Sequence, residues 1–243
     1  MAQYRDQAVV LRTYKLGESD RICILATLAH GKVRAVAKGV RKIKSRLGAR
    51  MEPLNHVQAL LWEGRNLDIV NQAEVIESFQ TIRSDLVKTA QANVLLEIAD
   101  KLFMEGHENE KLFVMLVRAL TTMQGCNSEL IVPAFMLKVL VDDGVGPDFT
   151  TCRRCESDQD LVAYSVLEAG VICGSCRRLS GESFVISPEA KDVLDLTLGG
   201  GLSGVLEQDY PKRLVGEVHH VATLAIEHHL ETRLKSLTVL ASV

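Results

Sequence analysis

The sequence of 243 residues predicts an α+β fold, in which an N-terminal β-barrel precedes an all-α helical domain with an inserted four-cysteine module. Turn-separated runs of β-favouring residues fill residues 5–75, and apolar residues recur at helical spacing from residue 84 onwards. Two Cys-x2-Cys pairs interrupt the helical part. We expect four segments: a basic barrel at 1–80, a helical body at 81–149, a metal-binding module at 150–180, and the rest of the helical body at 181–243.

Five short strands are expected in the barrel. Glycine-containing turns at 16–18, 30–31 and 63–66 separate them, as turns do in small all-β domains. Five strands at this spacing are typical of a small barrel such as the OB-fold, which is a nucleic-acid platform. An SH3-like barrel fits the pattern almost as well. The expected strands are residues 8–14, 21–28, 32–38, 57–63 and 67–74.

The apolar pattern changes to a helical period after the barrel. Apolar residues recur at helical spacing from Leu86 to Leu102, and we expect Ser84 to be the N-cap of this helix. The apolar stripes of this helix and of the further helices predict a hydrophobic core, and we assign no cofactor to the helices. Further helices are expected at 112–120, at 130–141, after the cap formed by Ser187 and Pro188, and at 211–230.

The four paired cysteines predict a structural zinc site. Two residues separate the cysteines within each pair and 17 residues separate the pairs, which matches two zinc knuckles. Two knuckles supply the four tetrahedral thiolates that a structural Zn2+ prefers, and they leave no open position for a catalytic water. A pair of redox motifs, a chance arrangement or an iron–sulfur cluster are the alternatives. A redox motif is expected near a βαβ pattern, and none surrounds the cysteines. Knuckle pairs fit zinc better than an iron–sulfur cluster. The expected ligands of one Zn2+ ion are Cys152, Cys155, Cys173 and Cys176.

The formal charge of −3 conceals a basic N-terminal third. Residues 1–80 carry 13 Lys and Arg against 8 Asp and Glu, whereas the rest of the chain carries 15 against 23. From Arg21 to Met51 there are nine basic residues and no acidic one, an asymmetry that is typical of a nucleic-acid or membrane contact. The expected nucleic-acid-binding residues are Arg21, Lys32, Arg34, Lys38, Arg41, Lys42, Lys44, Arg46 and Arg50.

Strand alternation and a loop give this basic segment its expected geometry. Lys32, Arg34 and Lys38 alternate with apolar residues, so they are expected to share one face of a strand. Residues 40–50 have little apolar content, which predicts an exposed loop. Strand and loop together would offer a cationic track to a phosphate backbone. A solvated charged surface, an anionic membrane or an acidic protein tail are the alternatives.

Other patterns indicate no further chemistry. Residues 199–204 match Gly-x-Gly-x-x-Gly, but no strand precedes them as a dinucleotide-binding turn requires. No complete catalytic motif occurs, so we expect a protein that is not an enzyme. Tyr14 and Trp62 are expected at core strand positions rather than on a base-stacking surface. The longest largely apolar stretch, 130–141, is too short to span a membrane, and no secretory signal is visible at the start.

The order of several short blocks resembles the RecO family of bacterial recombination mediators. No single block is specific, but their combined order along almost the whole chain is. The strongest blocks are AVVLR at 8–12, LGESDRI at 16–22, HGKV at 30–33, AKGVRK at 37–42, LLWEGRNL at 60–67 and LKSL at 234–237.

This resemblance implies an N-terminal OB-fold, a helical body and a zinc-binding module. It also implies a cytoplasmic, nucleoid-associated DNA repair and recombination protein without catalytic activity, which binds single- and double-stranded DNA and anneals complementary strands. The implied partners are RecR and, further, RecF, RecA and the tail of single-strand-binding protein, with no membrane partner. The family's cationic DNA surface maps by block onto Lys38, Arg41, Lys42, Lys44 and Arg46.

Two hypotheses from other classes of protein stay open. A zinc-ribbon module that binds RNA or acts in transcription would share the charge and the metal, but it would prefer RNA and lack annealing activity. A metal-dependent nuclease would need a carboxylate cluster near the basic face, and residues 21–51 contain no carboxylate side chain.

Overall fold

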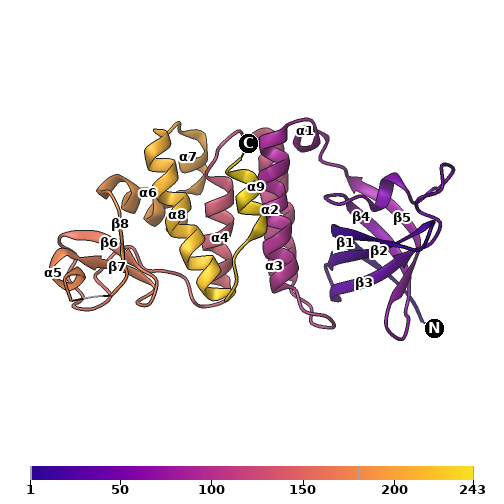
Figure 1. The fold of residues 1–243 in the computed structure, drawn as a ribbon, viewed down its shortest axis with the longest axis horizontal. Helices are drawn as coiled ribbons and strands as arrows, with labels where there is room; N and C mark the ends of the chain where they lie inside the picture. Colours follow the sequence, from indigo (N-terminus) through magenta and orange to yellow (C-terminus); the bar gives the residue numbers. More distant parts are fainter. Residues whose placement is uncertain (1, 180, 243) are drawn as a thin grey trace. The chain divides into compact units, whose positions relative to one another are not determined.

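The structure, a computed structural model, describes residues 2–179 and 181–242 (Figure 1). Contacts between residues divide the chain into two compact units. The first unit joins Met1–Gln124 to Lys235–Val243, and the second is Gly125–Leu234. The C-terminal segment therefore returns to the first unit, and the second unit is an insertion in the chain of the first.

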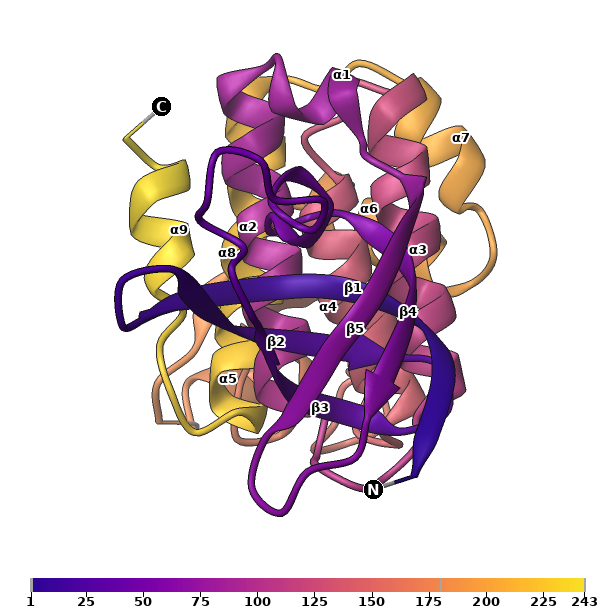
Figure 2. The ribbon, with the colours of Figure 1, turned by 90° about the vertical axis from the view of Figure 1, so that its right-hand side faces the viewer.

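The N-terminal strands form a closed barrel with the order β1-β2-β3-β5-β4. Strands β3 and β5 pair in parallel, and the other neighbours pair antiparallel. In Figure 2, β5 crosses in front of β1 and β2, as the strand tilt of a small barrel requires. This five-stranded closure is OB-like, and all five predicted strands are confirmed. Their bounds are β1 (Gln3–Leu16), β2 (Asp20–Thr27), β3 (Gly31–Ala37), β4 (His56–Trp62) and β5 (Asp68–Glu77).

Both faces of part of the barrel wall are buried. Inward-pointing residues such as Val10 and Leu25 fill the barrel. Cys23 belongs to the same core, and burial raises the pKa of its thiol to about 12. Outward-pointing Val9 and Ala26 are also fully buried, because helix α2 (Leu86–Leu102) packs on β1 and β2.

Between the barrel and the long helix α2 lies one short helical turn that the sequence pattern did not predict, α1 (Gln80–Arg83). Ser84 ends this turn, so the prediction that it caps the following helix was wrong. Asp85 is the N-cap of α2, and its carboxylate accepts a hydrogen bond from the Lys88 N–H at 3.0 Å. The unit also contains η1 (Ala49–Met51), α3 (Glu110–Gly125) and α9 (Lys235–Leu240).

The second unit combines helices with a small sheet. Ser187 caps α6 (Pro188–Leu198) as predicted, since its hydroxyl accepts from the Ala190 N–H at 3.2 Å. Helix α6, and not a strand, directly precedes the glycine-rich residues 199–204, in agreement with the sequence analysis. No helix in the described part of the chain is long and apolar enough to cross a bilayer. The other elements are α4 (Ile131–Asp142), β6 (Leu161–Ser165), β7 (Gly170–Cys173), α5 (Gly174–Arg177), β8 (Phe184–Val185), α7 (Leu202–Glu207) and α8 (Lys212–His229).

Candidate metal centre and nucleic-acid interface

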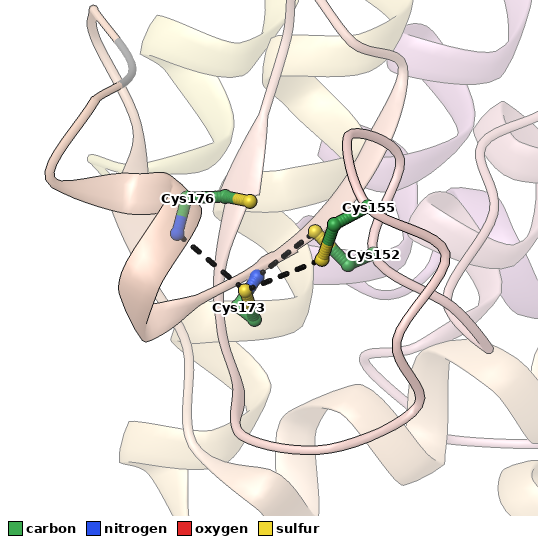
Figure 3. Close-up of side chains that lie close together, drawn as sticks. All are labelled: Cys152, Cys155, Cys173 and Cys176. Atoms are coloured by element: carbon green, nitrogen blue, oxygen red, sulfur yellow. Dashed lines mark hydrogen bonds between the residues drawn. The ribbon is translucent and has the colours of Figure 1, made fainter.

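The four paired cysteines converge in the second unit (Figure 3). Their Sγ atoms all lie within 4.8 Å of one another, and the Sγ atoms of Cys155 and Cys173 are 3.8 Å apart. In a tetrahedral zinc site with Zn–S bonds of about 2.3 Å, the sulfurs lie about 3.8 Å apart. The cluster therefore has the dimensions of a zinc site.

Local backbone structure builds the two knuckles. In the first, the Cys152 N–H donates to the Ser157 carbonyl at 2.8 Å, and Glu156 adopts a left-handed φ of 61° that closes the turn. The second knuckle is the junction of β7 and α5, where Cys173 is the N-cap. Between the two cysteine pairs, β6 and β7 form an antiparallel hairpin that brings the two knuckles together.

Backbone N–H groups stabilise negative charge on the sulfurs. The Cys173 N–H donates to the Cys152 Sγ at 3.4 Å. Although burial opposes ionisation, N–H donors from Cys173, Arg154 and Cys155 lower the pKa of the Cys152 thiol. Hydrogen bonds with the Cys155 and then the Cys173 thiol raise the pKa of Cys176. The cluster thus favours a first thiolate and opposes a further one, and a dication held by the four sulfurs would reverse that opposition.

The nine predicted nucleic-acid-binding residues fall into three groups in the structure, all within the first unit. Three of them face carboxylates. Arg21 Nη1 lies 2.6 Å from the Glu52 carboxylate, and Lys32 Nζ lies 3.4 Å from that of Asp100. Arg34 Nε lies 3.9 Å from a carboxylate in the loop between α2 and α3. These three cations therefore already have anionic partners.

Two further arginines bind backbone carbonyl groups. Arg41 donates to the carbonyls of Gly17 and Glu18 at 3.3 and 3.0 Å, and Arg50 donates to that of Ala73 at 2.9 Å. The side chains of the remaining four are exposed and make no hydrogen bond or ion pair with any described residue. These four, which we call the free cations, are Lys38, Lys42, Lys44 and Arg46.

All four free cations lie in one loop, residues 38–48, between β3 and η1; we call it the cationic loop. Its base is fixed to the β1–β2 turn. The Asp20 Oδ1 accepts the Gly39 N–H at 2.7 Å, and the Arg41 N–H donates to the Ser19 carbonyl at 2.9 Å. The hydrogen bond from Gly39, and then the one from Ser19, lower the pKa of Asp20. Burial of Val40 in the barrel core adds an apolar anchor.

Sequence reasoning missed the role of Asp20. The available signal was its position directly after the 17–19 turn, where a short carboxylate commonly accepts backbone N–H groups. The expectation for the two strand aromatics was wrong, because Tyr14 and Trp62 are 45% and 38% exposed. Both lie near strand ends, beyond the packed part of the barrel, and the Arg12 guanidinium lies 5.1 Å from the centre of the Tyr14 ring.

Comparison with known proteins agrees with this architecture. Residues 1–79 match the family described as Recombination protein O N terminal, and residues 83–238 match Recombination protein O C terminal. DNA repair protein RecO of Frankia casuarinae is 39% identical over 244 residues, which cover 99% of each chain. DNA repair protein RecO of Nocardioides sp. is 36% identical over 241 residues, or 96% of this chain and 97% of that one. The chain therefore belongs to the RecO family of DNA repair proteins.

Proposed function

We propose that this protein binds single- and double-stranded DNA through the cationic loop and anneals complementary strands without catalysing a covalent step. The observation that carries the proposal is the group of four free cations, Lys38, Lys42, Lys44 and Arg46, on a loop with a fixed base. Neutralising phosphates with such side chains releases condensed counterions, which drives binding. Phosphate contacts carry no direct sequence information, so sequence preference should be weak.

Annealing follows from the same charge. Two complementary single strands repel one another through their phosphates, and a cationic surface that binds both of them lowers this repulsion. Base pairing then supplies the free energy that joins the strands. On this proposal residues 1–80 act as the DNA-binding domain, and the remaining predicted contacts Arg21, Lys32, Arg34, Arg41 and Arg50 contribute less, because their side chains already have partners.

Membership of the RecO family supports partners from recombination. We expect RecR to be the direct partner, and RecF, RecA and the tail of single-strand-binding protein to take part in loading RecA onto coated DNA. A protein that repairs the bacterial chromosome would act in the cytoplasm, in association with the nucleoid.

The four-cysteine cluster would hold one zinc ion with a structural role. Cys152, Cys155, Cys173 and Cys176 would be its ligands, and four thiolates satisfy a tetrahedral zinc completely. Bound zinc supplies a cross-link between the two knuckles. The β6–β7 hairpin and the N–H donors to sulfur orient the ligands for that ion.

The test is annealing of two dye-labelled complementary oligonucleotides, followed by fluorescence without ATP at several salt concentrations. We expect acceleration that fades with salt and that is lost in the variant K42E/R46E. The matched control K101E/R118E, which changes two exposed cations on α2 and α3, should retain activity. Intact DNA binding without acceleration would contradict the annealing role, and a preference for RNA would favour the RNA-binding hypothesis.

A further inference from the structure

The tip of the cationic loop carries an apolar side chain that nothing in the fold explains. Ile43 has an exposed fraction of 105%, the largest among the exposed large hydrophobic residues that the structure describes. Its neighbours in sequence, Lys42 and Lys44, are both exposed and belong to the free cations. An isolated apolar residue on a surface is common, so exposure alone carries no conclusion.

The local backbone gives a second observation. The Ser45 N–H donates to the Lys42 carbonyl at 2.9 Å, and the Lys42 N–H donates to the Gly39 carbonyl at 3.1 Å. Ile43 therefore occupies the first corner of a closed β-turn. Turn corners favour Gly, Pro, Asn, Asp and Ser for conformational reasons, and a β-branched apolar residue brings none of these advantages. Neither local structure nor packing accounts for isoleucine at this position.

The loop is built to hold this tip outward. One side of the loop is fixed by Val40 in the barrel core and by the Asp20 contact with Gly39. The other side is fixed by Leu47, which packs against the same core and accepts the Met51 N–H at 3.0 Å. A tip with two anchored sides loses little conformational freedom when it binds a partner.

We propose that Ile43 is an apolar wedge that contacts the bases of bound DNA while the adjacent lysines bind its phosphates. The inference rests on the proposed function, because it concerns the same loop. Charge complementarity selects the partner: the loop presents one apolar side chain between two unpaired cations, which matches the alternation of bases and phosphates along a nucleic-acid strand. Apolar side chains inserted between base steps unstack them in many architectural DNA-binding proteins. Unstacked bases on a bound strand are available to a complementary strand.

The two parts of the loop should respond differently to mutation. The lysines act through counterion release, so their loss changes the salt dependence of affinity. Ile43 carries no charge, so the variant I43S should bind DNA with an unchanged salt slope. Removing the burial of one aliphatic side chain should weaken binding about tenfold at every salt concentration. The variant I43L, which keeps an apolar side chain of equal volume, should retain most of the affinity.

The experiment uses a single-stranded oligonucleotide that contains 2-aminopurine, whose fluorescence rises when its neighbours unstack. The wild-type protein should raise this fluorescence at saturation, I43S should not, and I43L should restore the rise. The control L86S removes another exposed aliphatic side chain, which is 70% exposed on α2, and should behave like the wild type. Thermal unfolding of each variant checks that the fold is unchanged.

Three outcomes would overturn the inference, and they are distinguishable. Equal affinity and equal fluorescence of I43S and the wild type, with K42E/R46E defective, would remove Ile43 from the site and leave the proposed function intact. Failure of the wild type itself to bind DNA would overturn both. Binding of I43S to DNA like the wild type, combined with loss of binding to phosphatidylserine vesicles, would assign the tip to an anionic membrane surface instead.

Discussion

Neutralising two of the free cations should change how DNA binding depends on salt. Each phosphate contact contributes about 0.7 to the slope of log K against log salt for single strands, and about 0.9 for duplex DNA. If each of the four free cations contacts one phosphate, the cationic loop contributes about 3 to this slope for single strands. The variant K42Q/R46Q removes two contacts, so its slope should be smaller by about 1.4.

This difference in slope gives a measurable loss of affinity. Between 50 and 200 mM salt, four contacts predict about a 50-fold fall in affinity for a single strand, whereas two contacts predict about a 7-fold fall. At 0.1 M salt the variant should bind about 25-fold more weakly than the wild type, and the difference should vanish towards 1 M salt. Glutamine keeps a polar side chain that can form hydrogen bonds but carries no charge, so the change reports mainly the loss of charge.

Fluorescence anisotropy of a labelled oligonucleotide at five or more salt concentrations measures the slope. The control K101Q/R118Q removes two exposed charges from α2 and α3, so it matches the change in net charge without touching the loop. A variant slope equal to that of the wild type would refute the assignment of phosphate contacts to the cationic loop. An equal decrease of the slope in both double variants would instead show that DNA binding depends on the net charge of the protein and not on the position of the charges.

Three further predictions concern the stability of the fold. Removing the metal with a chelator should increase hydrogen exchange across 150–180 and leave the barrel protected; unchanged exchange in that segment would contradict a structural metal. The substitution Gly31→Ala should lower the free energy of unfolding, measured with urea, by about 3 kcal/mol or more. The residue has a left-handed φ of +67°, and an added Cβ atom would also collide with the His107 carbonyl oxygen. Gly106 has a φ of +74° but open space around it, so Gly106→Ala should lower the free energy of unfolding by only about 1–2 kcal/mol. Equal losses of stability in the two variants would disprove the collision at Gly31. Since the pKa of Asp20 is lowered, its bond to Gly39 is fully present above the ordinary value of 3.8 and is lost only as the pH falls through the lower value. The Gly39 amide resonance should therefore not move between about pH 5 and pH 8, and a midpoint at or above 3.8 would contradict the lowered pKa.

The sequence determined the elements whose signals are local. Alternation of apolar and polar residues predicted all five barrel strands, because the period of a strand depends only on its neighbours in sequence. The spacing of the four cysteines predicted their cluster, since a two-residue gap makes a knuckle wherever it occurs. A local rule failed at Ser84, where Asp85 became the cap because an additional turn, α1, precedes α2.

Tertiary structure decided which charges are free to bind a partner. The sequence presents nine equivalent cations, but Lys32 meets Asp100, 68 positions away, and Arg21 meets Glu52, 31 positions away. Pairings of this kind depend on how the barrel closes and how α2 packs on it, and no period or motif encodes them. The same holds for Tyr14, which lies at a strand position but beyond the packed wall. Local patterns therefore predict the strands and the metal ligands, whereas long-range packing leaves four cations and Ile43 exposed on one loop.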